Sequence, residues 1–148
     1  MPKSIYLDTS AVVKRFLEEE GTQIVDSFFE QCYDEKAELV LSQWNLGEAA
    51  VVFNKYENRN IIPSAEESFM LLYNELSLLV KLGSTRIVPV LGKIVSDSIP
   101  LILKYQLYIA DAIQITTCTS QECDLFATFD DRLADIAENE GLNVLKNS

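Results

Sequence analysis

Four acidic side chains stand out in this sequence because of the residues around them: Asp8, Glu48, Asp111 and Asp130. Asp8 and Asp130 follow short apolar runs that predict buried strands, whereas Glu48 and Asp111 interrupt the apolar faces of predicted helices. In an open parallel sheet the carboxyl ends of the strands share one edge, so distant residues can meet there around a ligand. Because carboxylates suit a hard cation best, we expect the four acids to share a divalent metal ion.

Each acid also has a simpler interpretation. Since 23 of the 148 residues are Asp or Glu, acids at helix starts are expected by chance, and Asp8 and Asp130 taken alone are better explained as helix caps. For Glu48 and Asp111 the alternative is a buried ion pair with Lys or Arg. Asp111 is the strongest single candidate, because Leu107 to Ile115 contains no other charged residue and an unpaired buried carboxylate is costly.

The composition limits the chemistry further. The chain has no histidine, which excludes Ser-His and Cys-His catalysis and imidazole-bound zinc. Cys32, Cys118 and Cys123 lack the close-set pairs of a zinc site, so we expect reduced thiols packed as small hydrophobes and do not favour a Cys118 to Cys123 disulfide. With 48% apolar residues and no leader-like or membrane-spanning run, the chain is expected to be one cytoplasmic domain.

The net charge of −11 argues against nucleic-acid binding, because affinity for phosphate normally comes from Lys and Arg. It does not exclude such binding, since metal ions can reverse the local sign of an acidic pocket. Each basic side chain taken singly is better explained as solvated surface. The basic residues considered are Lys14, Arg15, Lys55, Arg59, Arg86 and Arg132.

Short apolar runs alternate with helical patterns along the whole chain, which predicts an α/β domain with a parallel sheet. Ser64 and Glu67 form a capping-box pattern for a long helix, and Pro100 is expected to kink or split a later one. The predicted strands are 4–7, 39–41, 85–88 and 125–128, with a further edge strand at 142–145. The predicted helices are 11–17, 22–33, 42–58, 64–81, 94–105, 109–122 and 130–140.

The segments around the four acids form a recognisable combination. They are Leu7-Asp8-Thr9-Ser10-Ala11-Val12-Val13-Lys14, the helical Glu48, Ala110-Asp111-Ala112-Ile113, and Thr128-Phe129-Asp130-Asp131-Arg132-Leu133 through Glu140-Gly141-Leu142. In this order they closely resemble the PIN-domain ribonuclease family, and within it the VapC-type toxins of toxin-antitoxin pairs. The resemblance covers essentially the whole chain, and its opening and closing motifs are fairly specific in combination.

The resemblance implies a PIN-like doubly wound parallel sheet of about four to five strands, with helices on both faces, as a single domain over residues 1–148. It implies that Asp8, Glu48, Asp111 and Asp130 are catalytic and bind Mg²⁺ or Mn²⁺, with Thr9 and Thr128 lining their pocket. On the chemistry, we expect Asp8 and Asp111 to hold the principal ion. Glu48 and Asp130 would then complete its coordination, bind a second ion or orient the attacking water.

The resemblance further implies a ribonuclease acting on single-stranded or loop RNA, a small antitoxin partner and a homodimer. The sequence departs from the family pattern at Gln114, where many relatives have histidine, and at Thr116 and Thr117, which replace small alanines. Asp131 leaves open which acid of its pair faces the metal.

Other functions remain open alternatives. The first is a non-catalytic PIN-like module that binds protein or RNA. A signalling receiver domain is disfavoured because no lysine lies just beyond the strand at 125–128. A haloacid-dehalogenase-like phosphatase would need a second acid two residues after Asp8, where Ser10 stands instead.

Overall fold

A four-stranded parallel sheet with the strand order β3-β2-β1-β4 forms the centre of the protein. The computed structural model describes residues 2–145, so residues 1 and 146–148 of the predicted 1–148 domain lie outside the described residues. The strands are β1 (Lys3–Leu7), β2 (Ala37–Ser42), β3 (Thr85–Val88) and β4 (Leu125–Ala127). Because β2 and β4 flank β1 on opposite sides, the winding reverses next to β1, where open α/β sheets bind ligands.

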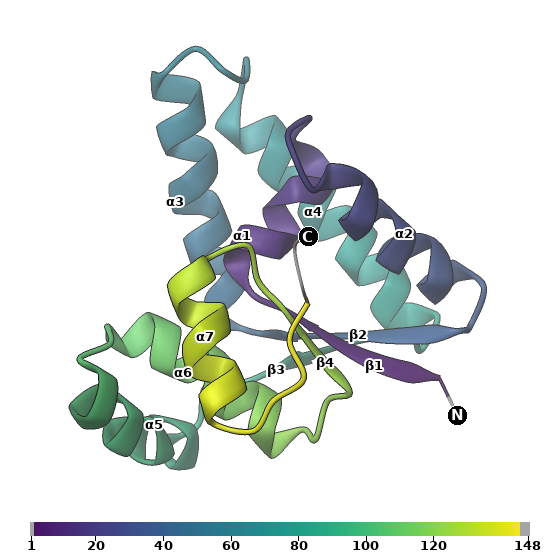
Figure 1. Ribbon diagram of the computed structural model, residues 1–148. Helices are drawn as coiled ribbons and strands as arrows, with labels where there is room; N and C mark the ends of the chain where they lie inside the picture. Colours follow the sequence, from purple (N-terminus) through teal and green to yellow (C-terminus); the bar gives the residue numbers. More distant parts are fainter. Residues whose placement is uncertain (1, 146–148) are drawn as a thin grey trace.

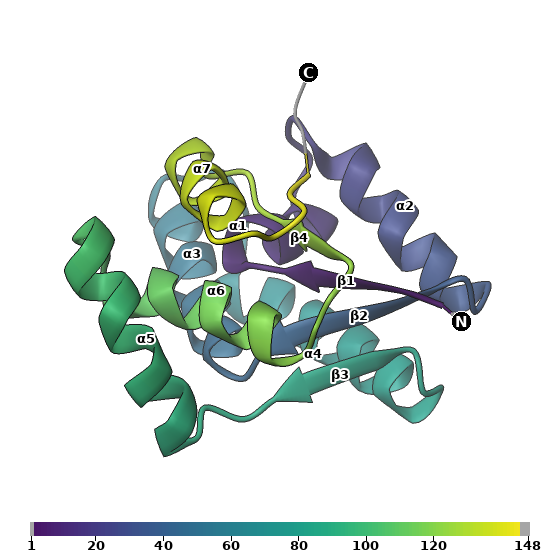
Figure 2. The same ribbon diagram turned by 60° about the horizontal axis from the view of Figure 1, so that its bottom comes forward.

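Helices cover both faces of this sheet, which confirms the predicted doubly wound α/β class (Figure 1 and Figure 2). One face carries α1 (Thr9–Val12), a 3₁₀ turn (Val13–Phe16), α2 (Thr22–Tyr33), α3 (Trp44–Asn58) and α4 (Ala65–Lys81). The other face carries α5 (Gly92–Tyr105), α6 (Ile109–Ser120) and α7 (Asp131–Asn139). In the described part of the chain, no helix combines the length and apolar character needed to cross a bilayer.

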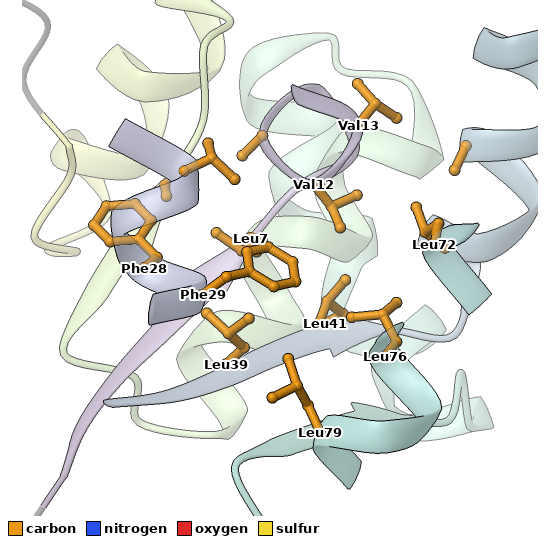
Figure 3. Close-up of a cluster of buried hydrophobic side chains, with 14 of the residues drawn as sticks. Leu7, Val12, Val13, Phe28, Phe29, Leu39, Leu41, Leu72, Leu76 and Leu79 are labelled. Carbon is orange, nitrogen blue, oxygen red and sulfur yellow. The ribbon is translucent and has the colours of Figure 1, made fainter. Parts of the chain in front are cut away.

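The alternation of side chains along the central strand divides the core in two. Ile5 and Leu7 of β1 point into the larger cluster, where Figure 3 shows Leu7 beside Phe29 of α2 and near Leu41 of β2. Tyr6 points to the other face and stacks on Phe126 of β4, with 5.5 Å between the ring centroids. Burial of these side chains fixes the register of β1, and it therefore fixes the position of Asp8 at the end of the strand.

Local signals explain where several helices begin. The Ser64 hydroxyl accepts a hydrogen bond from the Glu67 backbone N–H over 3.1 Å, so the predicted cap of α4 is confirmed. Gly21 precedes α2 with φ of 94°, and a Cβ atom there would lie 2.6 Å from a ring carbon of Phe129. Only glycine fits this contact without displacing the loop that follows β4.

Several predicted elements differ from the structure by one or two residues at an end, and four differences matter for the local structure. Ser42 ends β2 rather than opening a helix, and α3 begins at Trp44. The first helix starts earlier than predicted and tightens into the 3₁₀ turn. Pro100 lies inside a continuous α5 on an exposed side, where water can solvate the carbonyl group that proline leaves without a donor. The predicted edge strand is reduced to a single parallel bridge between Val144 and Phe126.

Candidate active site

Asp8 lies at the centre of the sheet edge, one residue beyond β1. Its backbone N–H donates to Ala127 O over 3.2 Å, and its side chain is almost completely buried. Asp8 Oδ1 accepts hydrogen bonds from Ser10 Oγ at 2.7 Å and from the Ala11 N–H at 2.9 Å, while Oδ2 accepts from Thr128 Oγ1. Asp8 therefore does cap α1, and its carboxylate retains lone-pair capacity for a further partner.

Ser10 and Thr128 join the turn after β1 to the loop after β4. Ser10 Oγ accepts a hydrogen bond from the Phe129 N–H over 2.9 Å, and Thr128 Oγ1 accepts one from the Asp130 N–H over 3.1 Å. Both hydroxyl groups also donate to Asp8, so they connect the two loops through this one carboxylate. Asp130 is thereby held beside Asp8.

Asp130 rather than Asp131 faces the other acids. Asp130 Oδ1 caps α7 by accepting from the Leu133 N–H over 3.0 Å, and its charge raises the pKa values of both Asp8 and Asp111. Asp131 lines a separate hollow formed with α7 and the segment after it. Of this pair, Asp130 is therefore the acid whose charge acts on Asp8 and Asp111.

Glu48 is brought to the same sheet edge by the second turn of α3. Asn45 of this helix is fully buried, and its Nδ2 donates to Leu7 O over 2.8 Å, which fixes α3 against the end of β1. Glu48 Oε1 accepts hydrogen bonds from Thr9 Oγ1 at 2.7 Å and from Gln114 Nε2 at 3.4 Å. Thr9 and Thr128, the two predicted pocket hydroxyls, therefore each orient a different carboxylate.

Asp111 approaches from the opposite layer, in the first turn of α6. Its charge raises the pKa of Glu48, so the acid of α6 acts electrostatically on the acid of α3. Arg132 lowers the pKa of Asp111 through its charge, yet neither Asp111 nor Glu48 forms an ion pair with any residue in the range 2–145. The buried ion-pair alternative is therefore not found.

Burial is the main cause of the raised pKa values in this group. It raises the pKa of Asp8 from 3.8 to about 6 against the opposing effect of three hydrogen bonds, and the charge of Asp130 adds to the rise. Burial likewise raises the pKa values of Glu48 and Asp111, each with a smaller contribution from a neighbouring acid. These charge effects link the four acids in the order Asp8, Asp130, Asp111 and Glu48, and we call this electrostatically linked set the row of acids.

A divalent ion at this row would be held by one or two acids at a time rather than by all four. Across residues 2–145, no three acidic or cysteine side chains converge as a ready-made metal site. Mg²⁺, however, usually keeps several waters and binds through only one or two carboxylates. Asp8 is buried, Glu48 and Asp111 are half-buried, and Asp130 is exposed. Neighbouring acids that repel each other and form no ion pair with a described Lys or Arg therefore fit such an ion.

A groove of about 860 Å³ runs beside these acids along α3. Thr9, Ser10 and Glu48 are its lining residues from the candidate site, and Lys55 lies on its wall without an ion pair to any described residue. Its remaining lining is largely apolar and consists of Gln43, Trp44, Gly47, Val51, Val52, Val90 and Ala110. In contrast to Lys55, Lys14, Arg15 and Arg86 form ion pairs with Glu or Asp.

Comparison with known families identifies this arrangement. The model of the PIN domain matches residues 5–139, a range that contains all four acids. The chain belongs to the PIN-domain family. The match covers nearly the whole chain, which confirms the resemblance inferred from the motifs. A comparison with curated proteins gives no match.

Solved structures share the PIN-domain fold with this chain at low sequence identity. The Mycobacterium tuberculosis toxin VapC20, described as cleaving the sarcin-ricin loop, gives a TM-score of 0.63 at 12% identity, covering 93% of this chain and 95% of its own. PAE2754 from Pyrobaculum aerophilum gives 0.65 at 15% identity, covering 97% and 92%. VapBC2 from Rickettsia felis, bound to a promoter DNA fragment, gives 0.61 at 12% identity, covering 96% and 97%.

Three residues of this PIN-domain site were not selected by sequence reasoning: Ser10, Asn45 and Gln114. Ser10 belongs to the motif that drew attention to Asp8, but a serine after a strand is so often a cap that its type gave no signal. Gln114 lies in the same charge-free stretch as Asp111 and is only 2% exposed. A buried amide needs hydrogen-bond partners, so its position in an apolar run was the signal available.

Proposed function

We propose that this protein is a metal-dependent endoribonuclease, the toxin of a VapBC-type pair, acting in the cytoplasm on single-stranded or loop RNA. The observation that carries the proposal is the row of four acids at the reversal point of the sheet. Asp8 and Glu48 are held by hydroxyl and amide donors, and none of the four acids forms an ion pair with Lys or Arg among the described residues. The cofactor in this proposal is Mg²⁺ or Mn²⁺.

The side chains have distinct roles in the proposed reaction. When bound, a divalent ion neutralises phosphate charge and lowers the pKa of a water molecule. Asp8 and Asp111 would hold the principal ion, while Glu48 and Asp130 complete its coordination, hold a second ion or orient the attacking water. The hydrogen bonds from Thr9 to Glu48 and from Thr128 to Asp8 support an orienting role for both threonines.

The proposed partner is a small antitoxin, bound to a homodimer of this chain. A net charge of −11 favours a basic partner. The groove supports the same idea, because Glu48 lies among its apolar lining residues, where a basic side chain of the partner would meet the row of acids. A short gene immediately upstream that encodes such a protein would be the quickest support for this part of the proposal.

Nuclease activity is tested with purified protein, unpaired and hairpin RNA, and Mg²⁺ or Mn²⁺. We expect cleavage that stops with EDTA and returns when the ion is restored in excess. Asp111→Asn should abolish it. Asp34→Asn should not, because Asp34 is an exposed acid at the end of α2, next to the amino-terminal end of β2. Cleavage that survives EDTA or persists in Asp111→Asn would contradict the proposal, and RNA binding without cleavage would favour the non-catalytic module.

The same variant tests the metal assignment through stability. A cation that binds only the folded protein stabilises it by about 2.7 kcal/mol at a hundredfold excess over its dissociation constant. We expect Mn²⁺ to raise the melting temperature of the wild type, and Asp111→Asn to lose most of that rise while its metal-free stability stays unchanged or increases slightly. A metal-free loss of roughly 3 to 5 kcal/mol with an unchanged Mn²⁺ response would instead indicate a broken buried ion pair.

A further inference from the structure

Behind Glu48, Tyr6 of β1 and Gln114 of α6 form a buried chain of hydrogen bonds that leads to this acid. Tyr6 Oη of β1 donates to Gln114 Oε1 of α6 over 2.6 Å, and Gln114 Nε2 donates to Glu48 Oε1 over 3.4 Å. Tyr6 is 0% exposed and Gln114 is 2% exposed. This chain of hydrogen bonds therefore begins in the apolar core between β1, β4 and α6 and ends at Glu48.

The chemistry of these groups allows only one direction of hydrogen-bond donation, from Tyr6 through Gln114 to Glu48. An ionised carboxylate only accepts hydrogen bonds, whereas an amide presents an acceptor oxygen on one side and a donor nitrogen on the other. If the Gln114 amide were turned over, its oxygen would face the Glu48 carboxylate and two acceptors would meet. The Tyr6 hydroxyl occupies the amide oxygen and so holds the NH₂ group toward Glu48.

We propose that Tyr6 and Gln114 are positioning residues that orient the Glu48 carboxylate for the divalent ion. The inference rests on the proposed function, because it assumes that Glu48 contributes to ion binding. Gln114 and Thr9 both donate to Glu48 Oε1, one from α6 and the other from the turn after β1. Two donors on one oxygen restrict the rotation of the carboxylate. Partners that orient a metal ligand in this way typically contribute 10-fold to 100-fold in metal affinity.

If Tyr6 and Gln114 only stabilised the fold, replacing them would change stability but not ion binding. Losing one partner leaves the other buried and unsatisfied, whereas replacing both by apolar groups of similar shape can be nearly neutral for stability. The double variant Tyr6→Phe with Gln114→Leu keeps the ring that stacks on Phe126 but removes the donor to Glu48. Stability and ion binding are thereby separated in one protein.

The test measures the Mn²⁺ dissociation constant by calorimetric titration and the melting temperature in EDTA. We expect Gln114→Leu alone to melt below the wild type, and the double variant to recover most of that loss. Mn²⁺ affinity should be about 10-fold lower or more in Tyr6→Phe, in Gln114→Leu and in the double variant. A double variant that binds Mn²⁺ as tightly as the wild type would overturn the inference.

Two further variants of this protein serve as controls. The matched control is Ser98→Ala with Thr116→Val. It removes a buried hydrogen bond of 3.0 Å between Ser98 of α5 and Thr116 of α6, neither of which contacts an acid through this bond. It should change the melting temperature but leave Mn²⁺ affinity within about twofold of the wild type. Glu48→Gln tests the assumption beneath the inference. If it binds Mn²⁺ like the wild type, the proposed ion assignment of Glu48 fails; if it binds weakly while the double variant does not, only the positioning role fails.

Discussion

At the residue scale, the most unusual group is the Asp8 carboxyl, which is buried next to another acid and yet caps a helix. Its pKa lies above the value of an exposed aspartate because burial disfavours the charge more strongly than the three hydrogen bonds favour it. A carboxyl that is harder to ionise in the folded protein than in the unfolded chain weakens stability at neutral pH. Protonation relieves this effect as the pH falls.

This sign gives a pH prediction. The pKa of Asp8 is about 6 in the folded protein against 3.8 as the reference, so the metal-free unfolding free energy should rise as the pH falls from 7 toward 4. Between pH 7 and pH 5 the contribution of Asp8 is roughly 1 kcal/mol. Urea unfolding in EDTA at both pH values should show this rise in the wild type and a smaller one in Asp8→Asn. Equal slopes in the two proteins would show that Asp8 is not the group responsible.

At the element scale, the position of α3 decides where Glu48 lies, and Asn45 determines that position. The Asn45 amide donates to the carbonyl group of the residue before Asp8, so one hydrogen bond sets the spacing between the two acids. The other amide atom, Asn45 Oδ1, is buried without a partner among the described residues. A polar group left unsatisfied in this way indicates that the donor side of the amide is what the fold requires.

Asn45→Ala should therefore lower the unfolding free energy by about 1 to 3 kcal/mol, because the Leu7 carbonyl loses its buried donor. It should also reduce the stabilisation by Mn²⁺, since α3 is no longer held at the end of β1. The comparison is Thr85→Val, which removes a buried hydroxyl that has no partner among the described residues. That variant should be as stable as the wild type or more so. Denaturant unfolding with and without Mn²⁺ measures both effects, and equal losses in the two variants would contradict the role of Asn45.

Elements with strong local signals were predictable from the sequence. The helix at Thr22–Tyr33 and the strand at Thr85–Val88 have the predicted bounds, because an apolar stripe and a short β-branched run define them. The strand-helix boundary at Ser42 was wrong, because a serine before a helical pattern resembles a cap whether or not it closes a strand. The four acids were proposed from their apolar surroundings, and their role in a site stays a prediction. The hydrogen bonds that Ser10, Asn45 and Gln114 make to Asp8, Leu7 and Glu48 depend on tertiary packing, which hydrophobic periodicity does not encode.

At the scale of the whole molecule, the net charge of −11 affects all three proposed ligands, namely the cation, RNA and a basic protein partner. Three of the six basic residues considered from the sequence are neutralised in ion pairs on the surface. Lys55 is instead in the groove beside Glu48. RNA binding by the protein without its ion should accordingly be weak, and a basic protein partner should associate rapidly at low ionic strength.

Co-expression with the neighbouring gene product tests the partner and the dimer together. We expect the two proteins to co-purify, with the light-scattering mass of a complex built on two copies of this chain. The association rate should fall steeply as salt is raised, because screening weakens long-range steering. A chain that remains monomeric and unaccompanied after co-expression would refute both the antitoxin and the homodimer.

The contact between Gly21 and Phe129 makes the loop that carries Asp130 sensitive to a residue that no search for reactive groups would select. Gly21→Ala would push on the ring between Thr128 and Asp130, whereas Gly83→Ala, at a φ of 79°, meets nothing within 4 Å. Both substitutions strain the backbone by about 1 kcal/mol, but only Gly21→Ala should lose cleavage and the Mn²⁺ response while its circular dichroism stays native. Equal activity in the two would disprove the effect. If it holds, random mutagenesis followed by selection for survival of the host should recover inactive alleles at Gly21 alongside those at the acids.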